Sequence, residues 1–154
     1  MGVVASMRKE ADRALGEHFV PRLREMGFRG SGQHFRRILE DRIDLVTVQF
    51  GKWDGSFCVN IAICPPGGPP ETMGRGVPPN KVTAFDIFPV RRRLTMKDGQ
   101  SDCWFRYYVG DGFGPHEFDG TPDECAIAAV AALVSRGEAF FQHSDRWWLR
   151  PGAQ

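Results

Sequence analysis

A chain of 154 residues with 42% hydrophobic residues is long enough to form one domain and to bury roughly 70% of the surface that the unfolded chain exposes. A net charge of +1 excludes a strong one-signed field, so nucleic acid or an anionic membrane would be attracted only by a local patch. No stretch of the sequence reaches the roughly 18 apolar residues that a membrane-spanning helix requires.

Apolar residues spaced three and four apart predict an amphipathic helix near the N-terminus. They are Met7, Ala11, Leu15, Phe19, Leu23 and Met26. Pro21 cannot donate a backbone hydrogen bond inside this helix, so we expect a kink or a break near Phe19. Gly27 is expected to end the helix in a left-handed conformation, with Phe28 folding back onto it.

Three strands follow, over residues 33–39, 42–50 and 56–64, with a hairpin signal at Asp54-Gly55 before the third. Because short turns connect them in order, they predict an antiparallel meander. Side chains alternate across a strand, so this meander has two unlike faces. Val46, Val48, Phe50, Phe57, Val59 and Ile61 form the core face, while Thr47, Gln49, Cys58 and Asn60 form a semi-polar second face. The second face is either solvated surface or the floor of a shallow groove.

The middle of the chain alternates between loop and strand signals. Residues 65–80 are rich in Pro and Gly and predict a mobile loop, which could instead be functional. Residues 81–89 and 102–109 predict two further strands, connected through Arg91-Arg92-Arg93 and a turn at Lys97-Asp98-Gly99. In the second of these strands Trp104, Arg106 and Tyr108 should point one way, and Phe105, Tyr107 and Val109 the other.

A C-terminal helix begins at Thr121, which has Pro122 at the first helical position and Glu124 to complete a capping box. Its expected buried residues are Ile127, Val130, Leu133 and Val134. Gly137 is expected to end it before a short helix over residues 138–143, and residues 150–154 are expected to fray. The sequence therefore predicts a single α+β domain over residues 1–154. Its antiparallel sheet, the three-stranded meander plus about two further strands, packs against an N-terminal and a C-terminal helix.

No arrangement of residues predicts a catalytic, cofactor-binding or metal-ligating set, so we expect no cofactor and lean against an enzyme. The four cysteines are too few for a disulfide scaffold, and we expect reduced thiols and a cytoplasmic protein. Cys58 and His34 form the one nucleophile and base pair that neighbouring strands could bring together, but nothing in their spacing favours it. Asp111-Gly112-Phe113-Gly114 is interpreted as a turn.

Arginine and aromatic residues mark the most distinctive expected surface, made of Arg91, Arg93, Trp104 and Arg106. Guanidinium groups bind phosphate or carboxylate, and aromatic rings stack on bases or on a partner's side chains. Single-stranded nucleic acid is one alternative for this surface. Salt bridges to residues 111–124, which hold five acids and no Lys or Arg, are another.

Several short motifs resemble the bacterial "domain of unknown function 4304" family. They are Gly27-Phe28 closing the first helix, Phe35 with Arg37 in the first strand, Gln49 near the end of the next strand and Asn60 within the third. The resemblance implies an α+β fold and no recognised chemistry, and it assigns no catalytic residue.

The expected function is that of a small non-catalytic domain that binds a protein partner, with an immunity or accessory factor as one form of it and its oligomeric state left open. The candidate surface is Gln49, Asn60, Arg91, Arg93, Trp104 and Arg106. Arg, Trp and Tyr are enriched where binding energy concentrates at interfaces. The alternatives are a small-ligand protein or enzyme with a groove over Gln49 and Asn60, and a weak binder of single-stranded nucleic acid. No membrane partner is expected.

Overall fold

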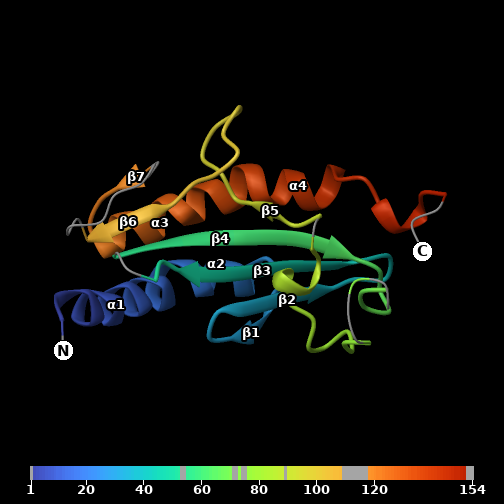
Figure 1. Ribbon diagram of the computed structural model, residues 1–154, viewed down its shortest axis with the longest axis horizontal. Coiled ribbons are helices and arrows are strands. Elements are labelled where there is room, and N and C mark those ends of the chain that lie inside the picture. The colour runs from blue at the N-terminus through green and yellow to red at the C-terminus, as the bar shows by residue number, and fades with distance from the viewer. Residues whose placement is uncertain are drawn as a thin grey trace.

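A mostly antiparallel sheet with helices on one face forms the frame of the molecule (Figure 1). The computed structural model describes residues 2–52, 55–70, 73, 76–88, 90–108 and 118–151. Over these residues the strands run in the order β1-β2-β3-β4-β6-β7, and β5 also pairs with β4. The α+β class expected from the sequence is confirmed.

The N-terminal helical segment consists of α1 (Val3–Ala14), the π-helical turn η1 (Leu15–Phe19) and α2 (Val20–Glu25). The irregularity expected near Phe19 is this wide turn, which lies directly before Pro21, the residue that has no N–H to donate. Gly27 ends the segment at φ +99°, and the backbone N–H of Phe28 donates to the Leu23 carbonyl. The predicted glycine cap is therefore confirmed.

The meander is present with continuous antiparallel pairing through β2 (His34–Ile38), β3 (Ile43–Phe50) and β4 (Gly55–Cys64). Asp54, in the expected turn before β4, lies outside the described residues. A further strand, β1 (Arg29–Ser31), pairs with β2 and was missed. Its centre is Gly30, where a Cβ would lie 2.2 Å from the His34 carbonyl oxygen, so only glycine fits this close approach.

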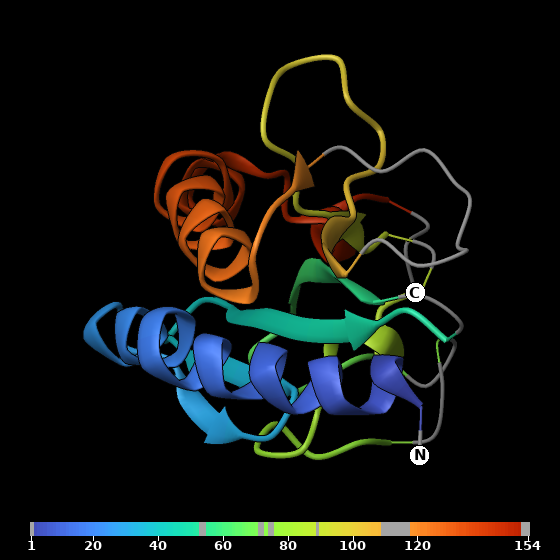
Figure 2. The ribbon, with the colours of Figure 1, turned by 90° about the vertical axis from the view of Figure 1, so that its left-hand side faces the viewer.

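The core lies between the helices and one face of the sheet, where both helical segments, blue and orange-red in Figure 2, lie against it. The second segment consists of α3 (Pro122–Ala132), η4 (Leu133–Gly137) and α4 (Glu138–His143). The predicted capping box at Thr121 is confirmed. Of its predicted buried residues, Leu133 is buried and Val130 packs against the core, but Ile127 and Val134 are 53% and 40% exposed, and a row of small residues faces inward instead. These residues are Cys125, Ala126, Ala129 and Ala132.

Gly137 does not end a helix, as expected from the sequence, but lies within a helical run at φ −64°. A Cβ there would lie 3.1 Å from Leu133 Cδ1 and 3.4 Å from Leu94 Cδ1. The glycine therefore allows the helix to approach the chain beside β5, and the helix continues because no left-handed residue interrupts it.

The second face of the sheet is not open surface. A second apolar cluster joins Ile43, Leu45, Ala62 and Cys64 of the sheet to Val82, Ala84 and Ile87. Residues 81–89 were predicted as a strand, but the described residues 81–88 cross this face instead. They contain the short 3-10 helix η3 (Ala84–Asp86), the yellow-green turn in front of β2 and β3 in Figure 1. The strand prediction was wrong because apolar side chains here cover a sheet face rather than extend it.

The remaining strands are β5 (Arg92–Arg93), β6 (Phe105–Tyr108) and β7 (Phe118–Asp119), and β7 runs parallel to β6. The predicted alternation in β6 is confirmed, since Phe105 and Tyr107 are buried while Arg106 and Tyr108 are half-buried. Val109 and the Asp111-Gly112-Phe113-Gly114 motif, named in the sequence analysis, lie outside the described residues.

The C-terminal residues fold back onto the sheet through the 3-10 helix η5 (Trp147–Leu149). The indole Nε1 of Trp147 donates to the Ile63 carbonyl over 3.0 Å. All four cysteines are buried and free, as expected. Among the described residues, no helix combines the length and the apolar character needed to cross a bilayer. The mobility of residues 65–80 stays a prediction.

A buried charge network joins the two helical segments to the sheet. The guanidinium of Arg37 donates to Asp44 on β3, to Glu138 on α4 and to the Met26 carbonyl at the end of the first segment. Arg42 donates to the same Asp44 carboxylate, with Nε 2.6 Å from Oδ1. The network thus connects β2, β3, α2 and α4 through a single buried guanidinium.

Acid should weaken the part of this network that depends on Glu138. Its hydrogen bond from Arg37 holds the pKa of the Glu138 carboxyl below its usual range. A carboxyl whose pKa is lower in the folded than in the unfolded protein stabilises the fold at every pH above its unfolded-state pKa of about 4.3. This stabilisation is lost as the pH falls through the pKa of the folded state. In thermal denaturation, the gap between the wild type and Glu138→Gln should be widest near neutral pH and close under more acidic conditions. A gap that stays constant with pH would contradict this assignment.

Candidate functional site

A chain of hydrogen bonds connects three of the six sequence-predicted surface residues on the second face of the sheet. Asn60 Nδ2 donates to Gln49 Oε1 over 3.1 Å, and Arg93 Nε donates to Asn60 Oδ1 over 3.3 Å. Arg93 also donates to Asp102, with Nη1 2.6 Å from Oδ1. We define Gln49, Asn60, Arg93 and Asp102 as the polar relay. It runs from Asn60, which is 1% exposed, to the surface at Asp102, whose side chain is 46% exposed.

Trp104 joins the polar relay through a cation–π contact, because the Arg93 guanidinium carbon lies 5.1 Å from its ring centroid. Arg106 points the same way from β6 but forms an ion pair with Asp119. Asp119 belongs to residues 111–124, so Arg106 forms the kind of salt bridge that the sequence analysis gave as an alternative for this surface. Arg92 pairs with Ile61 on β4 and therefore lies on the helix side of the sheet, opposite to Arg93, which pairs with Asn60.

Arg91 belongs to a different group, the aromatic–arginine patch, which we define as Phe85, Phe88 and Arg91. The Arg91 guanidinium carbon lies 5.2 Å from the Phe85 ring centroid and 5.7 Å from the Phe88 ring centroid. Phe88 is 67% exposed and Phe85 is 39% exposed. Sequence reasoning missed both rings, because residues 81–89 resembled a strand with buried apolar side chains.

The sheet beneath fixes the position of the aromatic–arginine patch. The backbone N–H of Ala84 donates to Thr47 Oγ1 over 3.2 Å, and Arg36 Nε donates to the Val82 carbonyl over 3.0 Å. A reciprocal capping box between Thr83 and Asp86 closes the short helix η3. The patch is therefore presented on a segment that is bonded to β2 and β3.

No activated nucleophile arises on this face among the described residues. Burial raises the pKa of the Cys58 thiol to about 12, and its Sγ contacts Gln49 Oε1. His34 Nδ1 instead lies 3.1 Å from Thr47 Oγ1, and burial followed by the nearby Arg36 charge lowers its pKa. The hypothetical pairing of Cys58 with His34 is therefore not made.

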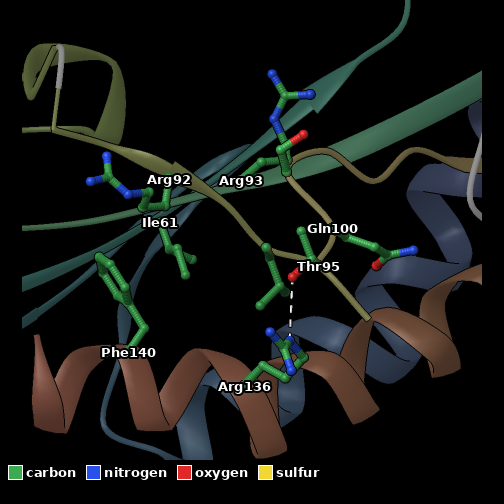
Figure 3. A pocket seen from close by; sticks show the side chains of 9 residues that line it. Ile61, Arg92, Arg93, Thr95, Gln100, Arg136 and Phe140 are labelled. Carbon is green, nitrogen blue, oxygen red and sulfur yellow. Dashed lines mark hydrogen bonds between the residues drawn. The ribbon is translucent and has the colours of Figure 1, made fainter. Parts of the chain in front are cut away.

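Two cavities lie between β5 and the C-terminal helices, on the opposite side of the sheet from the patch. One, of about 350 Å³, is lined by Ile61, Arg92, Thr95, Gln100, Arg136 and Phe140, among others (Figure 3). The other, of about 270 Å³, is lined by Ile63, Arg92, Phe140, Ser144, Asp145, Trp147 and Arg150, among others. They share Arg92 and Phe140, so we treat them as one β5–α4 groove. No local sequence signal links its walls, because they come from distant segments.

Glu17, His18 and Asp123 are the described residues whose ligand atoms come close enough to hold a metal ion, within 4.8 Å of one another. Arg13 already donates to Glu17 and Asp123, and its hydrogen bond holds the pKa of the Asp123 carboxyl below its usual range. A guanidinium thus supplies the positive charge that a metal would bring, and the cluster serves as a link between α1 and α3.

Residues 19–111 match the model of a protein family described as Domain of unknown function (DUF4304). The match spans β1 to β6, and thus the meander and the polar relay. No curated protein and no solved structure matches the chain.

Proposed function

Since this chain belongs to the DUF4304 family, whose description assigns no activity, we propose a function from its surface: it is a non-catalytic module that binds a protein partner through the aromatic–arginine patch. The observation that carries this proposal is the exposure of two phenylalanine rings beneath one arginine. An immunity or accessory role would be one setting for such a module.

Exposed rings of this kind favour a binding role on energetic grounds. Burying apolar surface contributes about 25 cal/mol per Å², and Phe88 leaves most of its surface in water. Aromatic and arginine side chains are enriched at the centres of protein interfaces. Because η3 is bonded to the sheet, little conformational freedom would be lost when a partner covers the patch.

The other functions considered from the sequence have less support. A ligand over Gln49 and Asn60 would find both amides hydrogen bonded within the polar relay. A base stacking on Trp104 would compete with the Arg93 guanidinium that already lies over its ring. A protein partner at the patch would not have to replace an existing contact in this way, since the outer surfaces of Phe85 and Phe88 are exposed to solvent.

The double variant Phe88→Ala/Arg91→Ala tests this proposal. It should keep the wild-type circular dichroism spectrum and melting temperature, because Phe88 is exposed and the Arg91 guanidinium lies over two exposed rings. Capture of a protein partner from a lysate of the source cells should fall roughly thirty-fold, as expected when a hot spot worth about 2 kcal/mol is lost. Quantitative mass spectrometry of the captured proteins measures the effect.

A matched control removes the same kinds of atoms elsewhere. Ile127 is 53% exposed on α3, and Arg22 forms an exposed ion pair with Glu25 on α2. The control Ile127→Ala/Arg22→Ala should capture partners as the wild type does. If the patch variant and this control capture the same proteins in the same amounts, the proposed binding surface is wrong.

A further inference from the structure

The β5–α4 groove is a second surface with the features of a ligand site, and it does not involve the patch. Its floor is apolar, with Ile61 and Ile63 of β4 on one side and Phe140 of α4 on the other. In Figure 3 Phe140 and Arg136 rise from the helix toward Ile61 and Thr95, and the Arg93 side chain points away. Ile61 and Ile63 are themselves only 3% and 2% exposed, so the apolar surface open to a ligand comes mainly from the half-buried Phe140 and Trp147 rings.

The walls of the groove carry excess positive charge. Apart from Arg93, which is held in the polar relay, its charged lining residues are Arg92, Arg136, Arg150 and Asp145. Asp145 pairs with Arg150, and Arg136 pairs with Asp98, whose side chain is 99% exposed and therefore strongly screened. The Arg92 guanidinium donates to the neighbouring Arg91 carbonyl, and Arg92 is exposed where the two cavities meet.

The backbone edge beside the groove is already occupied. The Trp147 indole donates to the Ile63 carbonyl, at a position where an added strand would otherwise pair with β4. Main-chain pairing of a partner strand is therefore blocked at this carbonyl, and recognition has to use side chains.

We propose that the β5–α4 groove binds an extended peptide segment with an acidic residue between two apolar ones. In an extended chain, residues i and i+2 point to one side and residue i+1 to the other. The two apolar side chains would thus enter the two cavities, against Ile61 and Phe140 and against Ile63 and Trp147. The carboxylate between them points to the rim, where it accepts a charge-assisted hydrogen bond from the Arg92 guanidinium.

Immobilised synthetic peptides test this proposal directly. Each peptide has a central Glu with one apolar residue, Leu, Ile, Phe or Trp, on either side of it, and Gly-Ser sequences at both ends. A matched set of peptides carries Gln in place of Glu. The wild type should retain Glu peptides about tenfold better than their Gln counterparts, the effect of one charge-assisted hydrogen bond. Arg92→Ala should lose this preference, because the variant removes the guanidinium alone.

Three comparisons decide the outcome. Arg22→Ala, an exposed arginine on α2, should behave as the wild type. Phe88→Ala/Arg91→Ala should also retain Glu peptides, which separates this site from the proposed function whether or not that function holds. Equal retention of Glu and Gln peptides, full retention by a folded Arg92→Ala variant, or complete competition by free glutamate or inorganic phosphate would overturn the peptide site.

Discussion

Replacing Asp44 with alanine should lower the free energy of unfolding by about 3–5 kcal/mol, the cost of leaving a buried charge without its partner. Asp44 is fully buried and accepts hydrogen bonds from both Arg37 and Arg42. Burial raises the pKa of its carboxyl, while the two guanidinium groups oppose that rise. The variant would leave two buried arginines short of a counter-ion, and urea denaturation measures the loss.

The control for this experiment is an aspartate on the surface. Asp12 pairs with Arg8 one helical turn away, and its side chain is 58% exposed. Asp12→Ala should change the free energy of unfolding by less than about 1 kcal/mol. If Asp44→Ala costs no more than Asp12→Ala, the network does not hold the helices to the sheet in the way described.

Replacing Phe57 with alanine should also cost about 3–5 kcal/mol of folding free energy, because it leaves a cavity in a close-packed cluster of rings. Phe57 is fully buried, and its ring centroid lies 5.1 Å from that of Phe105 and 6.4 Å from that of Tyr107. These contacts join β4 to β6. Chemical or thermal denaturation with a two-state fit measures the effect.

Phe88 provides a matched substitution on the surface. Phe88→Ala removes the same atoms from a site that is 67% exposed, and should change the free energy of unfolding by less than about 0.5 kcal/mol. This contrast bears on the proposed function, because a ring that contributes little to folding is available for a partner. A large loss of stability in Phe88→Ala would show that the ring is part of the core instead.

The candidate site was predictable from the sequence in part. Gln49 and Asn60 were identified as polar residues sharing one sheet face, and the structure joins them through a hydrogen bond. Their partners Arg93 and Trp104 were predicted as surface residues of a separate group. Only the pairing of Asn60 with Arg93 across β4 and β5 brings the two groups together, and pairing between distant segments leaves no local pattern in the sequence.

The helices show the same division. The starts and ends set by Thr121 and Gly27 were predictable, because capping depends on backbone groups within a few residues. The residues on the buried side of α3 were not predictable in this way, because most of them are alanines rather than larger apolar residues. Small side chains allow α3 to approach α1 closely, while Ile127 remains in solvent. Hydrophobicity alone does not reveal this preference for close approach.

The sequence by itself determined the meander with its two unlike faces, the helix caps at Thr121 and Gly27, and the absence of a recognised catalytic motif. These features follow from side-chain alternation and local hydrogen bonding, which neighbouring residues fix. Tertiary structure alone decided that residues 81–88 cover the second face, that Phe85 and Phe88 are exposed there, and that β5 and α4 enclose a groove. Each of these depends on which distant segments meet, and that is set by the packing of the whole chain.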